Sequence, residues 1–540
     1  MIKKNTFNLF NYSNSFFINF IRNFYLNSKF YNKKISKVTD RTLEYKPSVN
    51  LLNCIINQEN KKIKVEELYL NTIWDKKNSN HKTNKKLHSF FWLFSLDLKS
   101  SKNVTQDIIS DWIKKNETYD KEKWEIDILS KRIISWISIA KLTYEESDDN
   151  YKNKFNSMIQ KQINHLMYEI EKSNWVDDKM IGCAAVILAG LAYNEKDKYL
   201  SFGLNLLKKI INISFDKEGF PKTRNILQLI FYLKYFILIR EWLKESQNRI
   251  PEYLDEIIFY QGKSYALICR DNNNFLFNGN HNSELHEFEK YLDIHGYKFS
   301  NDSNEVGGYA ILKNKKNAIV MDIGTSPDKK FSKNYQSGAL SFEIFSNNKK
   351  LICNSGYFKK KNHKLNAISR SSAAQSALII DNHSSCKINI TTHEVNQGLK
   401  ILNKRIKKEN NYWIIKSSHD GYLKRYGIIH ERQIEFFVNE KKFVGKDKLI
   451  KKKNYSKNNF EIRFHVMPET KIMKTQDEKS ILIDLNNEGW RFTCPGHLIH
   501  IETGLYFGNK NSFVENENFF ISGLTSDEEQ VMKWEFNKIV

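Results

Sequence analysis

The spacing of apolar residues changes its period part-way along the chain. From residue 87 to about residue 250, apolar side chains recur every three or four positions, with short breaks between runs. From Gly307 onward they alternate or cluster in short runs separated by Gly, Asn, Ser and Lys. The first pattern is typical of amphipathic helices and the second of β-strands. Helices followed by strands predict an α+β chain with separate helical and sheet parts.

The length of 540 residues exceeds one ordinary domain and predicts two or three. Apolar residues make up 40% of the chain and aromatic residues 13%, which is enough to build large cores. We divide the chain into four predicted segments: an N-terminal extension (1–85), a helical domain (86–270), a linker (271–306) and a strand domain (307–540).

The helical part contains seven predicted helices. Successive amphipathic helices with short breaks form a bundle, a solenoid or a toroid, and the periodicity does not choose among these. The predicted helices span Ser89–Leu98, Val104–Lys115, Ile126–Leu142, Phe155–Lys172, Met180–Tyr193, Tyr199–Ile213 and Ile226–Glu245.

The strand part begins with closely spaced β signals. Apolar runs at Gly308–Ala310, Ala318–Asp322, Gly338–Phe345 and Leu351–Asn354 are bounded by turn residues. Such short runs predict a sandwich of antiparallel strands.

The formal net charge of +23 would concentrate polyanions such as nucleic acid, anionic lipid or acidic polysaccharide near the surface. A general bias towards Lys and Asn explains the same charge equally well. No long Lys/Arg block and no module that combines aromatic and basic residues is present, so nucleic acid is not an expected partner.

The N-terminal residues carry an apolar stripe at helical spacing, formed by Phe16, Phe17, Phe20, Ile21 and Phe24. Two interpretations are open: the stripe packs on the body of the protein, or it attaches to a membrane surface. Polar residues interrupt it, so we expect neither a clear signal peptide nor a membrane span.

The six cysteines are scattered without C-x-x-C spacing, which argues against a structural zinc site or a disulfide framework. The His281–Glu287 region lacks the H-E-x-x-H spacing, and no nucleotide-binding or serine-hydrolase motif is present. We therefore expect no metal and no cofactor. The oligomeric state is not predicted.

Polar motifs occur beside the strand runs in a fixed order. They include Gly307-Gly308-Tyr309, Gly338-Ala-Leu-Ser-Phe-Glu343, the Arg370–Asp381 run, His419–Tyr422, His430–Arg432 and Glu488-Gly-Trp490. This set resembles the C-terminal domain of the heparinase II/III-like family and covers about half of the chain. The resemblance implies an incomplete α/α toroid followed by an antiparallel β-sandwich. It also implies a polysaccharide lyase that cleaves a uronic-acid-containing anionic glycan by β-elimination.

The resemblance also suggests site residues. Elimination requires a group that neutralises the uronate carboxylate, a base that removes the neighbouring proton and an acid that protonates the leaving oxygen. The resemblance implies Asn225, Arg224, Gln375 and Arg370 for substrate binding. The candidates for proton transfer are Tyr422, His419, His430 and Tyr235. Each has a structural alternative: Asn225 as a helix cap, and the His and Tyr residues as packed or hydrogen-bonded strand residues.

One position departs from the family pattern. Where the family carries His after an Ala-Ala pair, this chain carries Gln375, which binds sugars but does not transfer protons near neutral pH. The alternative function is therefore a non-catalytic glycan-binding or envelope-polysaccharide-biogenesis protein on the same scaffold. By resemblance we expect the cell envelope or periplasm, with the cytoplasm left open because no signal peptide is clear.

Overall fold

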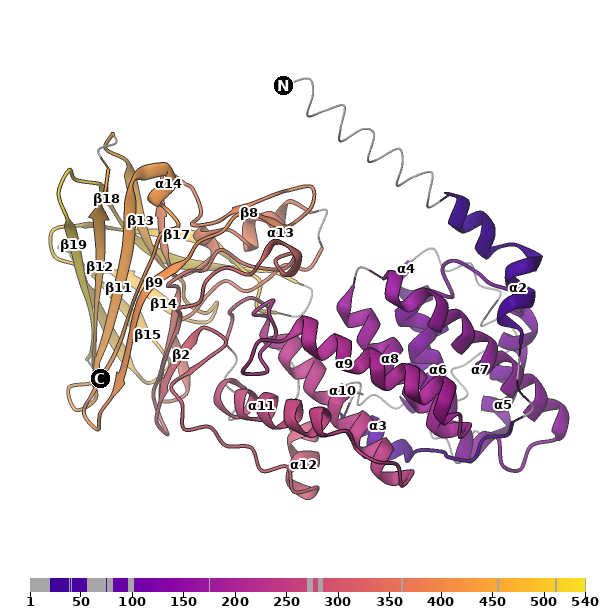
Figure 1. Cartoon of the computed structure of the whole chain (residues 1–540). Coiled ribbons are helices and arrows are strands. Elements are labelled where there is room, and N and C mark those ends of the chain that lie inside the picture. Colours follow the sequence, from indigo (N-terminus) through magenta and orange to yellow (C-terminus); the bar gives the residue numbers. More distant parts are fainter. Residues whose placement is uncertain are drawn as a thin grey trace. The chain divides into compact units, whose positions relative to one another are not determined.

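The computed structural model describes residues 20–37, 39, 41–55, 74, 81–95, 102–173, 175–269, 275–279, 285–360, 363–453, 456–509 and 512–539. These residues form two compact units (Figure 1). The helical unit draws on Met1–Ile213, Tyr232–Ile258 and Glu284–Tyr297, and the sandwich unit on Ser214–Phe231, Phe259–Ser283 and Lys298–Val540. The four predicted segment boundaries stay predictions.

The helical unit is built around α6 (Ile126–Thr143), which contacts α4 (His81–Ser89), α5 (Lys102–Lys115), α7 (Asp149–Glu169) and α8 (Val176–Ala192). The α8 sequence is almost wholly apolar, and all its residues from Met180 to Ala192 are buried. Asp177 and Asp178 stand in its first turn, where acidic side chains complement the helix dipole. Gly190 lets the following turn approach, since a Cβ there would lie 2.5 Å from the backbone nitrogen of Leu200.

Six of the predicted helices are confirmed, with ends that differ by a few residues; the first, Ser89–Leu98, is only partly matched and partly lies outside the described residues. Local patterns were sufficient because most of these helices carry apolar residues at helical spacing, and α8 is a long apolar run. In chain order the helices are α2 (Lys29–Ile35), α3 (Val49–Ile55), α4 (His81–Ser89), η3 (Phe91–Ser95), α5 (Lys102–Lys115), α6 (Ile126–Thr143), α7 (Asp149–Glu169), η4 (Ile170–Lys172), α8 (Val176–Ala192), η5 (Lys196–Leu200), α9 (Ser201–Ser214), α10 (Ile226–Glu245), α11 (Glu252–Ile268) and α12 (His286–Ile294).

The sandwich unit contains antiparallel sheets, as the strand signals predicted. The strands are β1 (Glu305–Val306), β2 (Tyr309–Lys313), β3 (Ala318–Asp322), β4 (Phe342–Ser346), β5 (Lys349–Ile352), β6 (Leu378–Ile380), β7 (Lys387–Ile388), β8 (Val395–Gln397), β9 (Ile401–Lys408), β10 (Tyr412–His419), β11 (Ile428–Phe437), β12 (Lys442–Lys451), β13 (Asn459–Phe464), β14 (Lys471–Lys474), β15 (Ser480–Asp484), β16 (Gly489–Thr493), β17 (Leu498–Tyr506), β18 (Val514–Leu524) and β19 (Gln530–Lys538).

These strands assemble into three larger sheets and one hairpin among the described residues. One sheet follows the order β1-β2-β3-β4-β5, and the second follows β14-β15-β16-β19-β12-β11-β10-β9. The third follows β17-β18-β13-β6, and β7 pairs with β8. Short segments between strands include η6 (Lys329–Phe331), α13 (Lys364–Ser369), η7 (Ser372–Ala374) and α14 (Leu423–Tyr426).

An aromatic core joins the three larger sheets. Phe464 of β13 stacks on Phe519 of β18, with ring centroids 5.0 Å apart, and meets Trp534 of β19 edge-on at 5.2 Å. Phe342 of β4 stacks on the same Trp534 at 5.3 Å. Sheets packed face to face over a shared apolar layer form a β-sandwich.

The N-terminal stripe lies partly within the described residues. Residues 20–26 are helical, and Phe20, Ile21 and Phe24 are exposed, so these three do not pack on the body. Phe16 and Phe17 lie outside the described residues. No helix within the described ranges is long and apolar enough to span a bilayer.

Candidate functional site

The sequence run with Arg370 and Gln375 lies between a short helix and a buried strand. α13 ends at Ser369, the η7 turn follows, and β6 begins at Leu378. Gln375 is only 1% exposed, and its Nε2 donates a hydrogen bond to the Ser369 carbonyl at 3.4 Å. The Gln375 amide is therefore bound within the protein.

The side chain of Gln336 connects this turn to two other segments. Its Nε2 donates to the carbonyls of Gly356 and Ser369, both at 2.8 Å. Its Oε1 accepts the Gly279 N–H at 2.9 Å, and its own N–H donates to Asn278 Oδ1 at 3.0 Å. A buried amide that satisfies this many groups fixes the relative positions of the segments it joins.

Asn225 lies beside this amide cluster and caps α10. Its Oδ1 accepts the N–H groups of Leu227 at 2.9 Å and Gln228 at 3.3 Å, which confirms the capping interpretation. A Cβ at Gly279 would lie 3.1 Å from that same oxygen, so this segment approaches Asn225 closely. Asn225 and Gln375 thus belong to one connected region, through Gly279 and Gln336, while their role in binding substrate stays a prediction.

Arg224 is used within the sandwich unit. Its guanidinium donates to Asp322 Oδ1 at 2.7 Å and to the carbonyls of Gly307, Gly308 and Gly324 at 3.0–3.2 Å. Burial opposes its charge, but Asp322 outweighs burial and the pKa of Arg224 is raised. An internal carboxylate therefore occupies the place that the sequence prediction gave to a substrate carboxylate, and the geometry gives that predicted role no support.

Tyr422 is buried, and its hydroxyl donates to the Leu378 carbonyl at 2.6 Å and the His383 carbonyl at 3.3 Å. Burial raises the pKa of Tyr422. These contacts attach α14 to β6 and favour the structural alternative for this tyrosine.

The two predicted histidines form a buried chain with fixed proton positions. His419 Nδ1 accepts the Gly421 N–H at 3.0 Å, so the ring proton lies on Nε2 and points to His430 Nδ1 at 3.3 Å. His430 Nε2 then donates to Asp447 Oδ1 at 2.6 Å. The hydrogen-bond pattern thus assigns both imidazoles as neutral.

The pKa shifts of the two histidines and of Asp447 agree with that assignment. Burial lowers the pKa of His419 and of His430. Asp447 raises the pKa of His430, but burial has the larger effect. The pKa of Asp447 is lowered despite burial, because Arg432 lies 2.7 Å away and acts as its counter-ion. Arg432 also donates to the Ser376 carbonyl at 2.9 Å, which ties the cluster to the residue after Gln375. The cluster of His419, His430, Arg432 and Asp447 therefore helps to hold the main chain next to Gln375.

Tyr235, the fourth proton-transfer candidate, lies on α10 in the helical unit and is 3% exposed. Burial raises its pKa, and Asp127 raises it further. Its predicted role stays a prediction.

A cavity of about 540 Å³ lies beside the Arg370 turn, and we call it the Arg370 cavity. It combines basic, amide, hydroxyl and apolar side chains. Within the described part of the chain, no Asp or Glu lines it. Its lining residues are Ser337, His363, Lys364, Asn366, Ala367, Arg370, Ser371, Ser384, Cys386, Ile388, Asn389, Ile390, Thr391 and His393.

Arg370 is the distinctive residue of this cavity. It is 2% exposed and donates to the carbonyls of Tyr335, Ser332 and His393 at 2.8–3.0 Å. Among the described residues it forms no ion pair with a carboxylate, and burial lowers its pKa. A buried cation bound only to neutral groups is costly. An acidic group of a ligand in the cavity would balance its charge.

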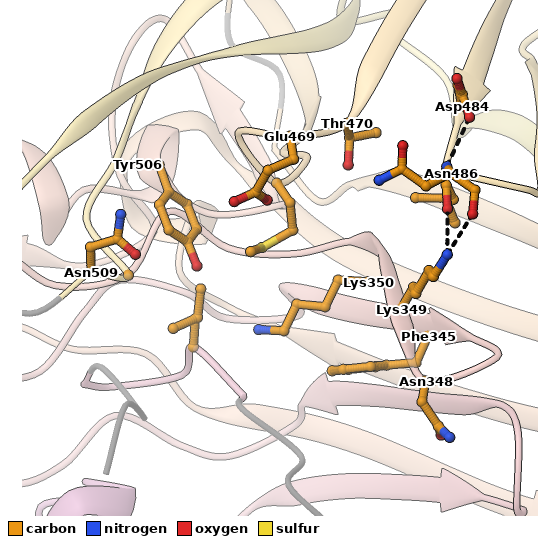
Figure 2. Close-up of a pocket in the computed structure, with 14 residues that line it drawn as sticks. Phe345, Asn348, Lys349, Lys350, Glu469, Thr470, Asp484, Asn486, Tyr506 and Asn509 are labelled. Atoms are coloured by element: carbon orange, nitrogen blue, oxygen red, sulfur yellow. Dashed lines mark hydrogen bonds between the residues drawn. The ribbon is translucent and has the colours of Figure 1, made fainter. Parts of the chain in front are cut away.

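A second cavity of about 500 Å³ lies beside β5, and we call it the Lys350 cavity (Figure 2). Both signs of charge line it: Lys349 and Lys350 on one side, Glu469 and Asp484 on the other. Lys350 Nζ lies 3.1 Å from the fully buried Glu343 carboxylate. Its lining is therefore nearly neutral in total charge.

Sequence reasoning missed several residues of the region. Gln336, Asn278, His363 and His393 carried no motif, because loop residues acquire their neighbours only through the fold. For His430 a signal was present: Ile428, His430, Arg432, Ile434 and Phe436 alternate along β11, and all five are buried. Period-two alternation with Ile434 and Phe436 places His430 on the core face.

All six cysteines are free thiols. Over the described ranges, no group of three or more His, Cys, Asp or Glu side chains is arranged to hold a metal ion. The chemistry available at the Arg370 cavity is therefore that of its guanidinium, ammonium, imidazole and amide groups.

Comparison with known proteins identifies the strand part. Residues 301–535 match the sequence model of the family described as heparinase II/III-like, C-terminal. No curated protein matches the chain by sequence.

Solved structures share the fold at low sequence identity. A heparinase III crystal structure is 13% identical, with 94% of this chain and 88% of that chain covered and a TM-score of 0.68. A heparinase III gene product is 15% identical, with 93% and 87% covered and a TM-score of 0.67. A mutant of the heparan sulfate lyase HepC from Pedobacter heparinus is 12% identical, with 86% and 78% covered and a TM-score of 0.66. Residues 301–535 therefore belong to the heparinase II/III-like C-terminal domain family, and the chain has the helical toroid and β-sandwich fold of these structures.

Proposed function

We propose that this protein binds a uronic-acid-containing anionic glycan at the Arg370 cavity and cleaves it by β-elimination. The observation that carries the proposal is Arg370, a buried cation bound only to main-chain carbonyls, in a cavity without carboxylates among the described residues. The fold of polysaccharide lyases supports the same class of substrate.

Arg370 would perform the first task of the reaction. Its guanidinium would pair with the uronate carboxylate and withdraw charge from it, which makes the neighbouring C–H bond acidic. The exposed ammonium of Lys364 at the start of α13 adds a second positive charge at the cavity. Ser371 and Thr391 add hydroxyl groups at the cavity that would bind sugar hydroxyls.

Two histidines would take part in the proton transfer, because His363 and His393 line the cavity, whereas Tyr422, His419 and His430 do not. His363 Nδ1 accepts the Leu365 N–H at 3.2 Å, which leaves its Nε2–H to donate a hydrogen bond to the substrate. His393 is then the proton acceptor. The C–H electrons form the new double bond as the glycosidic C–O bond breaks, and the imidazolium formed on His393 gives its proton to the leaving oxygen.

The test is the ultraviolet absorbance of the unsaturated uronate after incubation with heparan sulfate, heparin and alginate. We expect absorbance to rise with at least one glycan. We expect His393→Gln to lower the rate by about 10²–10⁴-fold. His363→Ala, which removes one hydrogen-bond donor, should lower the rate less. His500→Gln, outside the cavity, is the control and keeps the rate. No unsaturated product from any uronate glycan would reject cleavage.

A second candidate function, binding without cleavage, is favoured by Gln375. It occupies the position where the family carries His, and a carboxamide does not exchange protons near neutral pH. If this function holds, the protein binds the glycan without unsaturated product, and Lys364→Glu weakens binding. Turnover by the wild-type protein would exclude it, and Gln375→His tests whether the family residue adds activity.

A further inference from the structure

Residues 20–30, near the N-terminus, present large apolar side chains that the described part of the protein does not cover. Phe20, Ile21, Phe24 and Phe30 are 64%, 52%, 76% and 71% exposed. These four large exposed apolar side chains lie within eleven residues, and we call them the N-terminal face. Exposed apolar residues concentrated in this way mark an interaction surface.

The opposite side of the same segment is anchored to the helical unit. Tyr31 and Ile35 of α2 are buried, and the Tyr31 hydroxyl is 2.8 Å from His165 Nδ1 on α7. Arg22 pairs with Glu169 at the end of α7. Because this side is held by packing, a hydrogen bond and an ion pair, the N-terminal face is oriented outward.

The N-terminal segment itself carries charge of one sign. Residues 1–39 contain seven Lys or Arg residues and no Asp or Glu, and the first acidic residue is Asp40. Lys29 and Lys33 lie next to Phe30 and are exposed. Exposed Phe and Ile side chains flanked by Lys are the composition of a helix that lies in the interface of an anionic membrane.

We propose that the N-terminal face binds an anionic lipid bilayer surface. The phenylalanine rings enter the boundary between headgroups and acyl chains, and the lysines contact the acidic headgroups. The charge complementarity argues for this occupant over a second copy of the chain, because two such faces would bring like charges together. This inference is independent of the proposed catalytic function.

The test is co-sedimentation of the full chain with vesicles. One set contains phosphatidylglycerol and phosphatidylcholine in equal parts, and the other contains phosphatidylcholine alone. We expect binding to the anionic vesicles that weakens as salt is added, and at least about tenfold weaker binding to the neutral vesicles.

Two double variants separate the N-terminal face from the overall charge of +23. Phe24→Ser with Phe30→Ser should weaken vesicle binding by at least about tenfold. Phe259→Ser with Phe513→Ser, which are 57% and 48% exposed elsewhere, is the matched control and should bind like the wild type. Lys29→Glu with Lys33→Glu should also lose about tenfold, whereas Lys315→Glu with Lys316→Glu should not.

The proposal is overturned if the wild type does not sediment with anionic vesicles, or if both phenylalanine pairs affect binding equally. Equal binding to neutral vesicles also overturns it. Light scattering tests whether a second copy of the chain covers the N-terminal face instead. A wild-type dimer that dissociates in the Phe24→Ser, Phe30→Ser variant, without any vesicle binding, would make this face a self-association surface.

Discussion

The two cavities of the sandwich unit are similar in volume but differ in how their cations are neutralised. In the Lys350 cavity, Lys350 faces the buried Glu343 carboxylate. Lys349 donates to the carbonyls of Leu485 and Asn486 (Figure 2). In the Arg370 cavity, the buried guanidinium binds main-chain carbonyls and no described carboxylate.

This difference separates structural charge from charge available to a ligand. Glu343 accepts the N–H groups of Leu276 and Asn354 at 3.0–3.1 Å, so its ion pair with Lys350 belongs to a network that stabilises the fold. Arg370 keeps a net positive charge that the described residues do not balance. We infer that the Lys350 cavity contributes to stability and the Arg370 cavity to anion binding.

The largest expected effect is on stability at the Lys350 cavity. Lys350→Met leaves the Glu343 carboxylate buried without its counter-ion, so we expect the free energy of unfolding to fall by about 3–5 kcal/mol. Lys349→Met is the control, because it removes only hydrogen bonds to carbonyls and should cost about 1 kcal/mol. Urea denaturation measures both. Equal losses in the two variants would remove the distinction between these neighbouring lysines.

At the Arg370 cavity the main effect is on binding. Arg370→Gln removes the buried charge, and we expect affinity for a sulfated uronate oligosaccharide to fall by about 2–3 kcal/mol, measured by calorimetry. Lys350→Met should leave that affinity unchanged. Unaltered binding in folded Arg370→Gln would contradict the assignment of the site.

The histidine chain predicts a pH dependence of stability. Burial lowers the folded-state pKa of His419 and His430, so the unfolded protein binds more protons as the pH falls. Their contribution is complete above about pH 6.5 and declines below it, by up to about 1.4 kcal/mol per pH unit for each histidine. Thermal unfolding as a function of pH measures this slope. His430→Gln, which keeps a donor for Asp447, should reduce it, and an identical slope in this variant would show that the chain does not titrate as assigned.

The smallest effect concerns the rim of the Arg370 cavity. Lys364 is exposed, so Lys364→Glu should preserve stability and weaken glycan binding by about 1 kcal/mol, or about fivefold at low salt. Lys316→Glu, an exposed lysine elsewhere, is the control and should leave binding unchanged. Equal effects of the two substitutions would mean that only the total charge matters.

The sequence predicted most elements because each depends on a local pattern. α10 spans Ile226–Glu245 as predicted, and β3 spans Ala318–Asp322 as predicted. α10 has apolar residues at helical spacing and β3 is a short apolar run. Local periodicity does not contain the register between strands, and the pairing of His419 with His430 depends on that register.

The candidate site was only partly predictable for the same reason. The sequence identified Arg370 and Gln375 from a linear motif. The internal partner of Arg224 is Asp322, 98 residues away, and no local rule connects them. His393 reaches the Arg370 cavity from a loop before β8, and its main chain is held there by Arg370 itself. Such contacts arise only when distant segments pack together.

The most direct test of the central claim is a crystal structure of the protein with a bound uronate oligosaccharide. We predict that a carboxylate or sulfate group of the sugar lies within hydrogen-bonding distance of the Arg370 guanidinium. An oligosaccharide bound in the Lys350 cavity, with the Arg370 cavity empty, would contradict the account.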